Sequence, residues 1–253
     1  YTRCPFFSIR FFVQSYQHLK NELGISKIFI GLGGSTGGMQ LLEWAIEEPA
    51  LFEHIVPIAT NAVLSPWGIA FNASQRMAIE ADSTWLKKTN DAGQKGLAAA
   101  RSIAMLSYRH YNGYAITQRR DKAFVPLSTE TTYASDNYQR YQGLKLTKRF
   151  NSLCYYRLTQ SMDSHDVGRN RKSAAEALKL ITAKTLVIGI SSDILYPITE
   201  QEFLQQIIPG AELLKITSEF GHDGFLLEYE KIETALKEFI NNKKSSHLKI
   251  VNQ

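Results

Sequence analysis

The chain has 253 residues, of which 44% are hydrophobic and 21% charged, a balance typical of folded globular proteins. This composition excludes disordered, collagen-like and low-complexity classes, and no apolar run approaches the roughly 20 residues of a membrane-spanning helix. The net charge of +5 comes from scattered basic residues, whereas nucleic-acid binders concentrate them on one helix or stripe, so we expect no nucleic-acid or membrane partner. Only two cysteines are present and no signal peptide opens the sequence, which favours a cytoplasmic protein.

The first sixty residues predict helix, strand, helix and strand in succession. Apolar residues from Ile9 to Leu23 fall at helical spacing, and the apolar run Lys27–Leu32 is typical of a buried parallel strand. A second helix follows a glycine-rich turn, and His54–Thr60 predicts the next strand, with Pro57 suggesting an edge position or a bulge. Strand, helix and strand within about thirty residues form a βαβ unit, which predicts a parallel sheet.

The pattern changes after this unit. Apolar periodicity becomes helical and strand-like runs disappear, which indicates an inserted, mostly helical subdomain. Strands return at Thr185–Ile190 and Ala211–Ile216, and Glu228–Asn241 closes the fold as an amphipathic helix. We therefore predict an α/β fold with a core from residues 1–61 and 184–242, a helical cap or lid from 62–183, and a tail from 243–253.

A glycine-rich turn between the first predicted strand and the second helix has the pattern G-x-S-x-G, at Gly33–Gly37. In that context the pattern indicates a sharp turn that exposes a nucleophilic serine, here Ser35. We expect a side chain at either Gly33 or Gly37 to clash with the adjoining strand or helix, and the N–H of Thr36 to face a developing oxyanion. A phosphate-binding turn or a simple tight turn are the other interpretations, although no Walker motif is present.

A serine nucleophile needs an adjacent base and a carboxylate that orients the base. After a serine of this kind, the acid and then the histidine follow on loops behind later strands. Asp193 follows the predicted strand Thr185–Ile190, and His222 follows the predicted strand Ala211–Ile216. We therefore assign Ser35 as nucleophile, His222 as general base and Asp193 as the orienting carboxylate.

Three segments closely resemble one enzyme family. They are GGSTGGMQLLEWA (Gly33–Ala45), TLVIGISSDILYP (Thr185–Pro197) and GHDGFLLE (Gly221–Glu228). They resemble the homoserine O-acetyltransferases, which have the α/β-hydrolase fold and belong to methionine biosynthesis. SPWGIAFNASQR, ARSIAMLSYR and SMDSHDVGR are similar to the helical cap of that family, and the resemblance covers nearly the whole chain.

The resemblance implies a ping-pong reaction in which acetyl-CoA acylates Ser35, CoA leaves, and the side-chain hydroxyl of L-homoserine attacks the acyl-enzyme. His222 would deprotonate first the serine and later the incoming hydroxyl. By the same resemblance, Arg101 holds the substrate carboxylate, for which a guanidinium fork is suited, while Tyr108 lines the pocket and Asp223 lies near the substrate ammonium. The resemblance also implies a homodimer formed through the cap and no permanently bound cofactor. No His, Cys and carboxylate cluster has the spacing of a metal site.

Several alternatives stay open. Thr36 stands where the family usually has a larger apolar residue, so the pocket wall differs. Homoserine and serine differ by one methylene, worth about 1–3 kcal/mol in a pocket, and the choice of acetyl or succinyl donor depends on pocket shape. A homoserine O-succinyltransferase or a serine O-acetyltransferase is therefore also compatible. An esterase with the same triad is a further alternative, although Arg101 argues against it, and so is a non-catalytic interaction protein.

In the α/β-hydrolase fold several strands precede the nucleophile turn, and a loop after one of them donates the second oxyanion-hole N–H. Here one helix and one strand are predicted before Ser35. We therefore expect the N-terminal strands to be missing from this chain, and we expect the chain alone not to be fully active.

Overall fold

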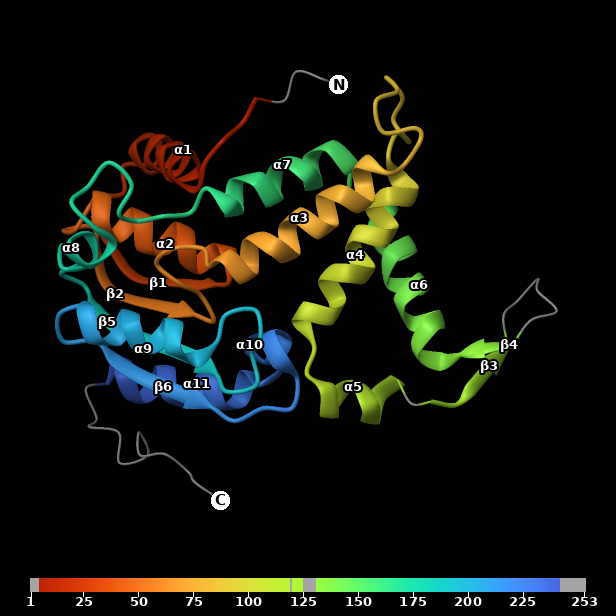
Figure 1. Cartoon of the computed structure of the whole chain (residues 1–253). Helices are drawn as coiled ribbons and strands as arrows, with labels where there is room; N and C mark the ends of the chain where they lie inside the picture. The colour runs from red at the N-terminus through yellow and green to blue at the C-terminus, as the bar shows by residue number, and fades with distance from the viewer. Residues whose placement is uncertain (1–4, 119, 125–130, 242–253) are drawn as a thin grey trace.

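A four-stranded parallel sheet forms the centre of the computed structural model, which describes residues 5–118, 120–124 and 131–241 (Figure 1). The strand order is β1-β2-β5-β6, and every neighbouring pair is parallel. The strands are β1 (Ile28–Gly34), β2 (Phe52–Ile58), β5 (Lys184–Ile190) and β6 (Glu212–Ile216). Because helices cover both faces of such a sheet, its central strands need continuous apolar runs, and β5 is buried at every residue after its first.

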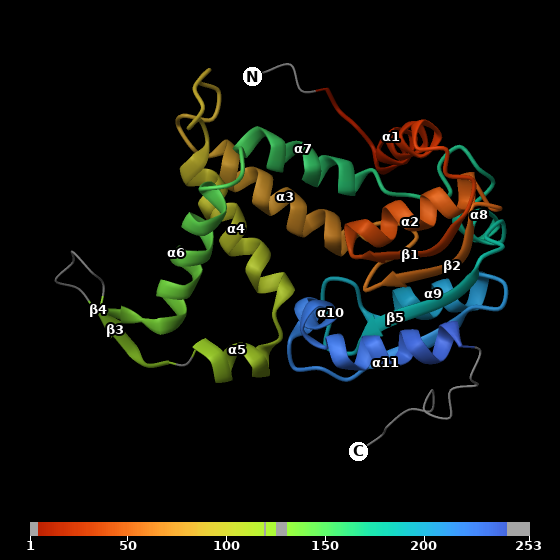
Figure 2. The same ribbon diagram turned by 180° about the vertical axis from the view of Figure 1, so that it is seen from behind.

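Helices pack on both faces of the sheet. One face carries α2 (Thr36–Glu47), α8 (Ala174–Leu178) and α9 (Ile198–Ile207), whose apolar residues join those of β2 and β5 in one buried cluster. The opposite face carries α11 (Tyr229–Ile240), with Ile232 and Phe239 packed against β2, β5 and β6 (Figure 2). α1 (Ile9–Glu22) lies on α2, outside the first layer. The predicted strands and helices of the core are therefore confirmed, with small shifts at their ends.

The expectation of an edge position or bulge at Pro57 is wrong. β2 lies between β1 and β5, and Pro57 pairs with Gly33 of β1. The pairing with β5 keeps one register at His54, Ile55 and Ile58, on both sides of the proline. A proline costs a strand one N–H donor, and here the parallel ladder continues past that position without a shift.

Between β2 and β5, residues 66–163 extend away from the sheet as a helical cap, whereas α8 packs on the sheet (Figures 1 and 2). Ile79, Leu97, Ala100 and Leu146 form a buried cluster of its own in this cap. A short antiparallel pair of strands interrupts the helices, and the cap is mostly helical, as predicted. The sequence did not indicate these two strands, because three residues are too few to show alternation. The elements are α3 (Pro66–Glu80), α4 (Gln94–Tyr108), α5 (Tyr111–Gln118), β3 (Lys122–Phe124), β4 (Thr131–Tyr133), α6 (Ala134–Thr147) and α7 (Ser152–Asp163).

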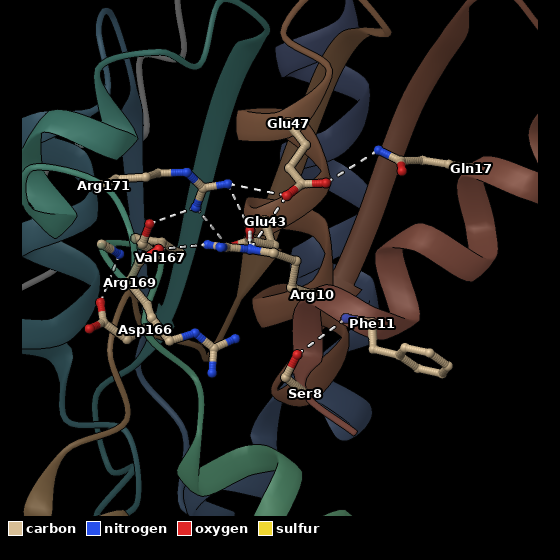
Figure 3. A network of polar contacts seen from close by, with 11 residues as sticks. Ser8, Arg10, Phe11, Gln17, Glu43, Glu47, Asp166, Val167, Arg169 and Arg171 are labelled. Carbon is tan, nitrogen blue, oxygen red and sulfur yellow. Dashed lines mark hydrogen bonds and ion pairs between the residues drawn. The ribbon is translucent and has the colours of Figure 1, made fainter. Parts of the chain in front are cut away.

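A buried ion-pair network joins α1, α2 and the loop before α8 (Figure 3). Glu43 on α2 is 2% exposed, and its carboxylate accepts hydrogen bonds from Arg10 and from Arg171, the latter at 2.8 Å from Nη2. Glu47 lies 3.4 Å from both guanidinium groups. Burial acts to raise the pKa of Glu43, but the hydrogen bonds from Arg171 and Arg10 lower it below its ordinary value. Glu43 therefore stays ionised and holds α1 and the loop onto the helix that follows Ser35.

Within the described ranges, no helix has the length and apolar character that crossing a bilayer requires. The predicted tail, residues 243–253, lies outside the described residues.

Candidate active site

Ser35 lies at the turn between β1 and α2, where it is the N-cap residue of the helix. Its backbone has φ 53 and ψ −121, a conformation that residues other than glycine rarely adopt. The turn is held by two hydrogen bonds: Ser35 N–H donates to Ile58 O at 2.9 Å, and Thr60 Oγ1 donates to Ser35 O at 2.8 Å. Backbone strain that the surrounding structure maintains in this way is typical of functional positions.

The two glycines of the motif differ in how closely they are packed. A Cβ atom at Gly33 would lie 2.4 Å from Gly37 O, so the turn has no room for a side chain there. A Cβ atom at Gly37 would meet nothing within 4 Å. The expected clash is therefore correct for Gly33 and wrong for Gly37, because Gly37 lies on the outer side of the first helical turn. The neighbouring Gly38 is the constrained one, since a Cβ there would lie 2.6 Å from Thr60 Cγ2.

The structure brings the side chains of Ser35, His222 and Asp193 into one hydrogen-bonded chain. Ser35 Oγ lies 3.0 Å from His222 Nε2, and His222 Nδ1 lies 2.7 Å from Asp193 Oδ2. Asp193 Oδ1 accepts hydrogen bonds from the N–H groups of Leu195 at 2.8 Å and Tyr196 at 2.9 Å. Both His222 and Asp193 are 4% exposed. Because the carboxyl ends of parallel strands meet at one sheet edge, loops far apart in sequence deliver the three groups to one place.

Thr36 begins α2 directly beside Ser35. The first N–H groups of a helix have no acceptor within the helix, and the helix dipole adds a partial positive charge there. The N–H of Thr36 therefore belongs to the positive end of α2, next to the serine hydroxyl. This arrangement is suited to binding an oxyanion that forms on a carbonyl attacked by Ser35.

Three further side chains lie near the triad. Two are on α4, namely Arg101 and Tyr108, and the third is Asp223, which directly follows His222. The Arg101 guanidinium carbon is 5.4 Å from the centroid of the Tyr108 ring, and that ring is 5.7 Å from the His222 ring. Burial raises the pKa of Tyr108, so its hydroxyl stays neutral. Burial also raises the pKa of Asp223, although Arg109, His222 and Arg101 act to lower it. Among the residues that the structure describes, no carboxylate forms an ion pair with Arg101.

One residue of this group was missed by the sequence analysis. Arg109 follows Tyr108 and forms an ion pair with Asp223, at 3.0 Å between Nη1 and Oδ2. Its Nη2 donates to the hydroxyl of Tyr138 on α6 at 2.9 Å. The only signal in the sequence is its position in the SYR segment, because nothing local indicates which acid it contacts.

The described part of the chain contains no group of three or more His, Cys, Asp and Glu side chains arranged to hold a metal ion. The polar groups around Ser35 are instead those of acid–base and oxyanion chemistry: one imidazole, one orienting carboxylate and one helix N-terminus.

A parallel sheet, a serine at a strained strand-to-helix turn, and an acid and a histidine on later loops define the class of α/β proteins with a Ser-His-Asp triad. Residues 2–229 match the family model for the alpha/beta hydrolase fold, and the chain belongs to this family. The fold predicted from the sequence is therefore confirmed.

The chain is also similar to proteins named homoserine O-acetyltransferase. It is 42% identical over 240 residues to the one from Cyclobacterium marinum, covering 93% of this chain and 66% of the relative. The solved structure of homoserine O-acetyltransferase from Bacillus anthracis has a TM-score of 0.85 at 20% identity, over 94% of this chain and 66% of that one. Esterase E22 has the same TM-score at 21% identity, over 93% of this chain and 67% of its own. These two structures show the shared fold, and the chain spans about two thirds of the length of these proteins.

Proposed function

We propose that the chain takes part in acyl transfer from acetyl-CoA to the side-chain hydroxyl of L-homoserine through an acyl-serine intermediate. The hydrogen-bonded chain from Ser35 through His222 to Asp193 is the observation that carries this proposal. As Ser35 Oγ attacks the thioester carbonyl, His222 Nε2 takes its proton and then gives it to the departing CoA sulfur. In the second half-reaction His222 takes the proton of the homoserine hydroxyl, whose oxygen attacks the acyl carbon. The proton then passes to Ser35 Oγ as the acyl–serine bond breaks.

Recognition of an amino acid as acceptor is supported by the charges beside the triad. Arg101 offers a guanidinium fork that no described carboxylate occupies, which suits the α-carboxylate of homoserine. Asp223 offers a negative charge for the α-ammonium group, and Tyr108 lies between Arg101 and His222. An esterase that transfers its acyl group to water needs neither charge. Relatives at 42% and 39% identity are named homoserine O-acetyltransferase, whereas esterase E22 is similar at the level of fold.

The pathway, the cellular compartment and the oligomeric state are inferred from the same proposal. Homoserine acetylation belongs to methionine biosynthesis, and its donor acetyl-CoA is an intracellular thioester, which favours the cytoplasm. A homodimer formed through the cap is supported by large apolar side chains that are exposed on the cap helices, namely Met77, Leu106, Tyr111, Ile116, Tyr141 and Leu144.

The test measures thiol release from acetyl-CoA with and without L-homoserine, in the wild-type chain and in Ser35→Ala. We expect release that depends on homoserine and is lost in Ser35→Ala. Succinyl-CoA and L-serine in the same assay distinguish the neighbouring donor and acceptor choices. Thiol release that is independent of any acceptor would contradict the transferase proposal and favour the esterase.

A further inference from the structure

Tyr196 contacts Asp193 and His222 and lies near Ser35, although the proposed reaction gives it no role. It follows Asp193 by three residues, and its side chain is 0% exposed. Its backbone N–H donates to Asp193 Oδ1 at 2.9 Å, and its ring centroid lies 5.1 Å from that of His222. The side chain of Ser35 acts to lower the pKa of Tyr196, which indicates that the two hydroxyls lie close together.

The hydroxyl of Tyr196 has no hydrogen-bond partner of regular geometry among the described residues. Leaving a buried hydroxyl unpaired is unfavourable, and a phenylalanine would fill the same space without this cost. The half-buried Tyr155 is different, because its hydroxyl donates to Gln75 Oε1. An unpaired buried donor next to a nucleophile indicates a partner that forms only during the reaction.

The protonation states of Tyr196 and Ser35 determine which of the two hydroxyls can donate a hydrogen bond to the other. Burial raises the pKa of Tyr196 far above its ordinary value, so the phenol keeps its proton and acts as a donor. In the resting state Ser35 Oγ donates its own proton to His222. Once His222 has taken that proton, Ser35 Oγ carries electron density that can accept a second hydrogen bond.

We propose that Tyr196 is a further catalytic residue, whose hydroxyl donates a hydrogen bond to Ser35 Oγ when that oxygen attacks and when it leaves. No proton is transferred from Tyr196: the phenol keeps it, and His222 carries the proton in both half-reactions. The interaction is therefore stronger in the transition states than in the resting enzyme, which is the condition for accelerating the reaction. This inference rests on Ser35 being the nucleophile, and it does not depend on which alcohol accepts the acyl group.

The test compares Tyr196→Phe with wild type, using p-nitrophenyl acetate as acyl donor and measuring the burst and the steady-state rate separately. We expect both rates to fall about tenfold, the effect of losing one hydrogen bond of ordinary strength. We expect Tm to stay the same or rise, because no regular hydrogen bond is lost. Tyr156→Phe is the matched control, since that hydroxyl donates to Glu80 on the surface of the cap.

A second readout is the rate at which a fluorophosphonate modifies Ser35, which forms a tetrahedral adduct and needs no acceptor. Slower modification in Tyr196→Phe at unchanged Tm supports the proposal. Unchanged rates in Tyr196→Phe would overturn it, and so would an equal loss of rate in the control variant Tyr156→Phe. Failure of the proposed function gives a different result: p-nitrophenol release and labelling that are the same in Ser35→Ala, or a Ser35 acyl-enzyme that no amino acid discharges.

Discussion

Arg109 and Asp223 form an ion pair that joins the cap to the core, with 3.0 Å between Nη1 and Oδ2. Arg109 is the C-cap residue of α4, and Asp223 directly follows His222. Because Arg109 also donates a hydrogen bond to the hydroxyl of Tyr138 on α6, two cap helices are joined to the loop that carries His222. Arg109 therefore already positions the carboxylate of Asp223, which is the group proposed to bind the substrate ammonium.

This pair predicts a change in pH dependence in Arg109→Gln. Burial raises the pKa of Asp223 and Arg109 opposes that rise, so removing Arg109 raises the pKa further. In the proposed reaction the ionised carboxylate of Asp223 binds the substrate ammonium, so kcat/KM for homoserine should be lost as pH falls through this pKa. We expect the acid limb of the pH profile to move to higher pH, with about tenfold lower kcat/KM on that limb. Arg109→Lys keeps the charge and serves as control; identical acid limbs in wild type and Arg109→Gln would refute the prediction.

Replacing two glycines of the turn around Ser35 by alanine, one at a time, should have opposite effects on stability. Gly33→Ala introduces a Cβ against the carbonyl of Gly37 and should lower the free energy of unfolding by about 3 kcal/mol. Gly37→Ala meets open space in the first turn of α2 and should raise it by about 0.5–1 kcal/mol. Urea unfolding of both variants measures the difference. Equal destabilisation by the two substitutions would show that the packing at this turn is not as described.

The network around Glu43 predicts a large effect of removing one buried charge. Glu43→Gln leaves Arg10 and Arg171 without their shared carboxylate, and we expect a loss of about 3 kcal/mol in the free energy of unfolding. Glu47→Gln is the matched control, because Glu47 is more exposed and lies farther from both arginines, and it should cost less than about 1 kcal/mol. Denaturant unfolding at neutral pH gives both values, and similar losses in the two variants would argue against a dominant role of Glu43.

The burial of His165 should make the protein less stable in mild acid. It is buried, its Nε2 lies 2.9 Å from Asn61 O, and burial lowers its pKa to about 4. The unfolded chain binds a proton to this histidine below a pH of about 6.5, whereas the folded chain does not until about pH 4, so stability falls as pH decreases across that window. Between pH 7.5 and pH 5 this histidine should contribute a loss of about 2 kcal/mol.

The variant His165→Gln isolates that contribution, because its amide can still donate to Asn61 O and does not titrate. We expect its unfolding free energy to change less between pH 7.5 and pH 5 than that of wild type. If the two proteins lose stability equally over this range, another group causes the loss.

The sequence was sufficient for the core because its signals are local. Each buried strand is a short apolar run, and Asp193 and His222 could be located since each follows such a run at the edge where parallel strands end. The position of Pro57 in a central strand depends on which strands pair, and that information is not local. The contacts of Arg109 and Tyr196 depend on how the cap helices and the loop after β5 meet around His222, for which no periodicity exists.

The most direct test of acyl transfer through Ser35 is the intact mass of the protein after brief exposure to acetyl-CoA without acceptor, followed by peptide mapping. We predict one added acetyl group on Ser35, its absence in Ser35→Ala, and its loss when L-homoserine is added, with O-acetylhomoserine as product. Acetylation that persists in Ser35→Ala, or an acetylated Ser35 that homoserine does not discharge, would contradict it.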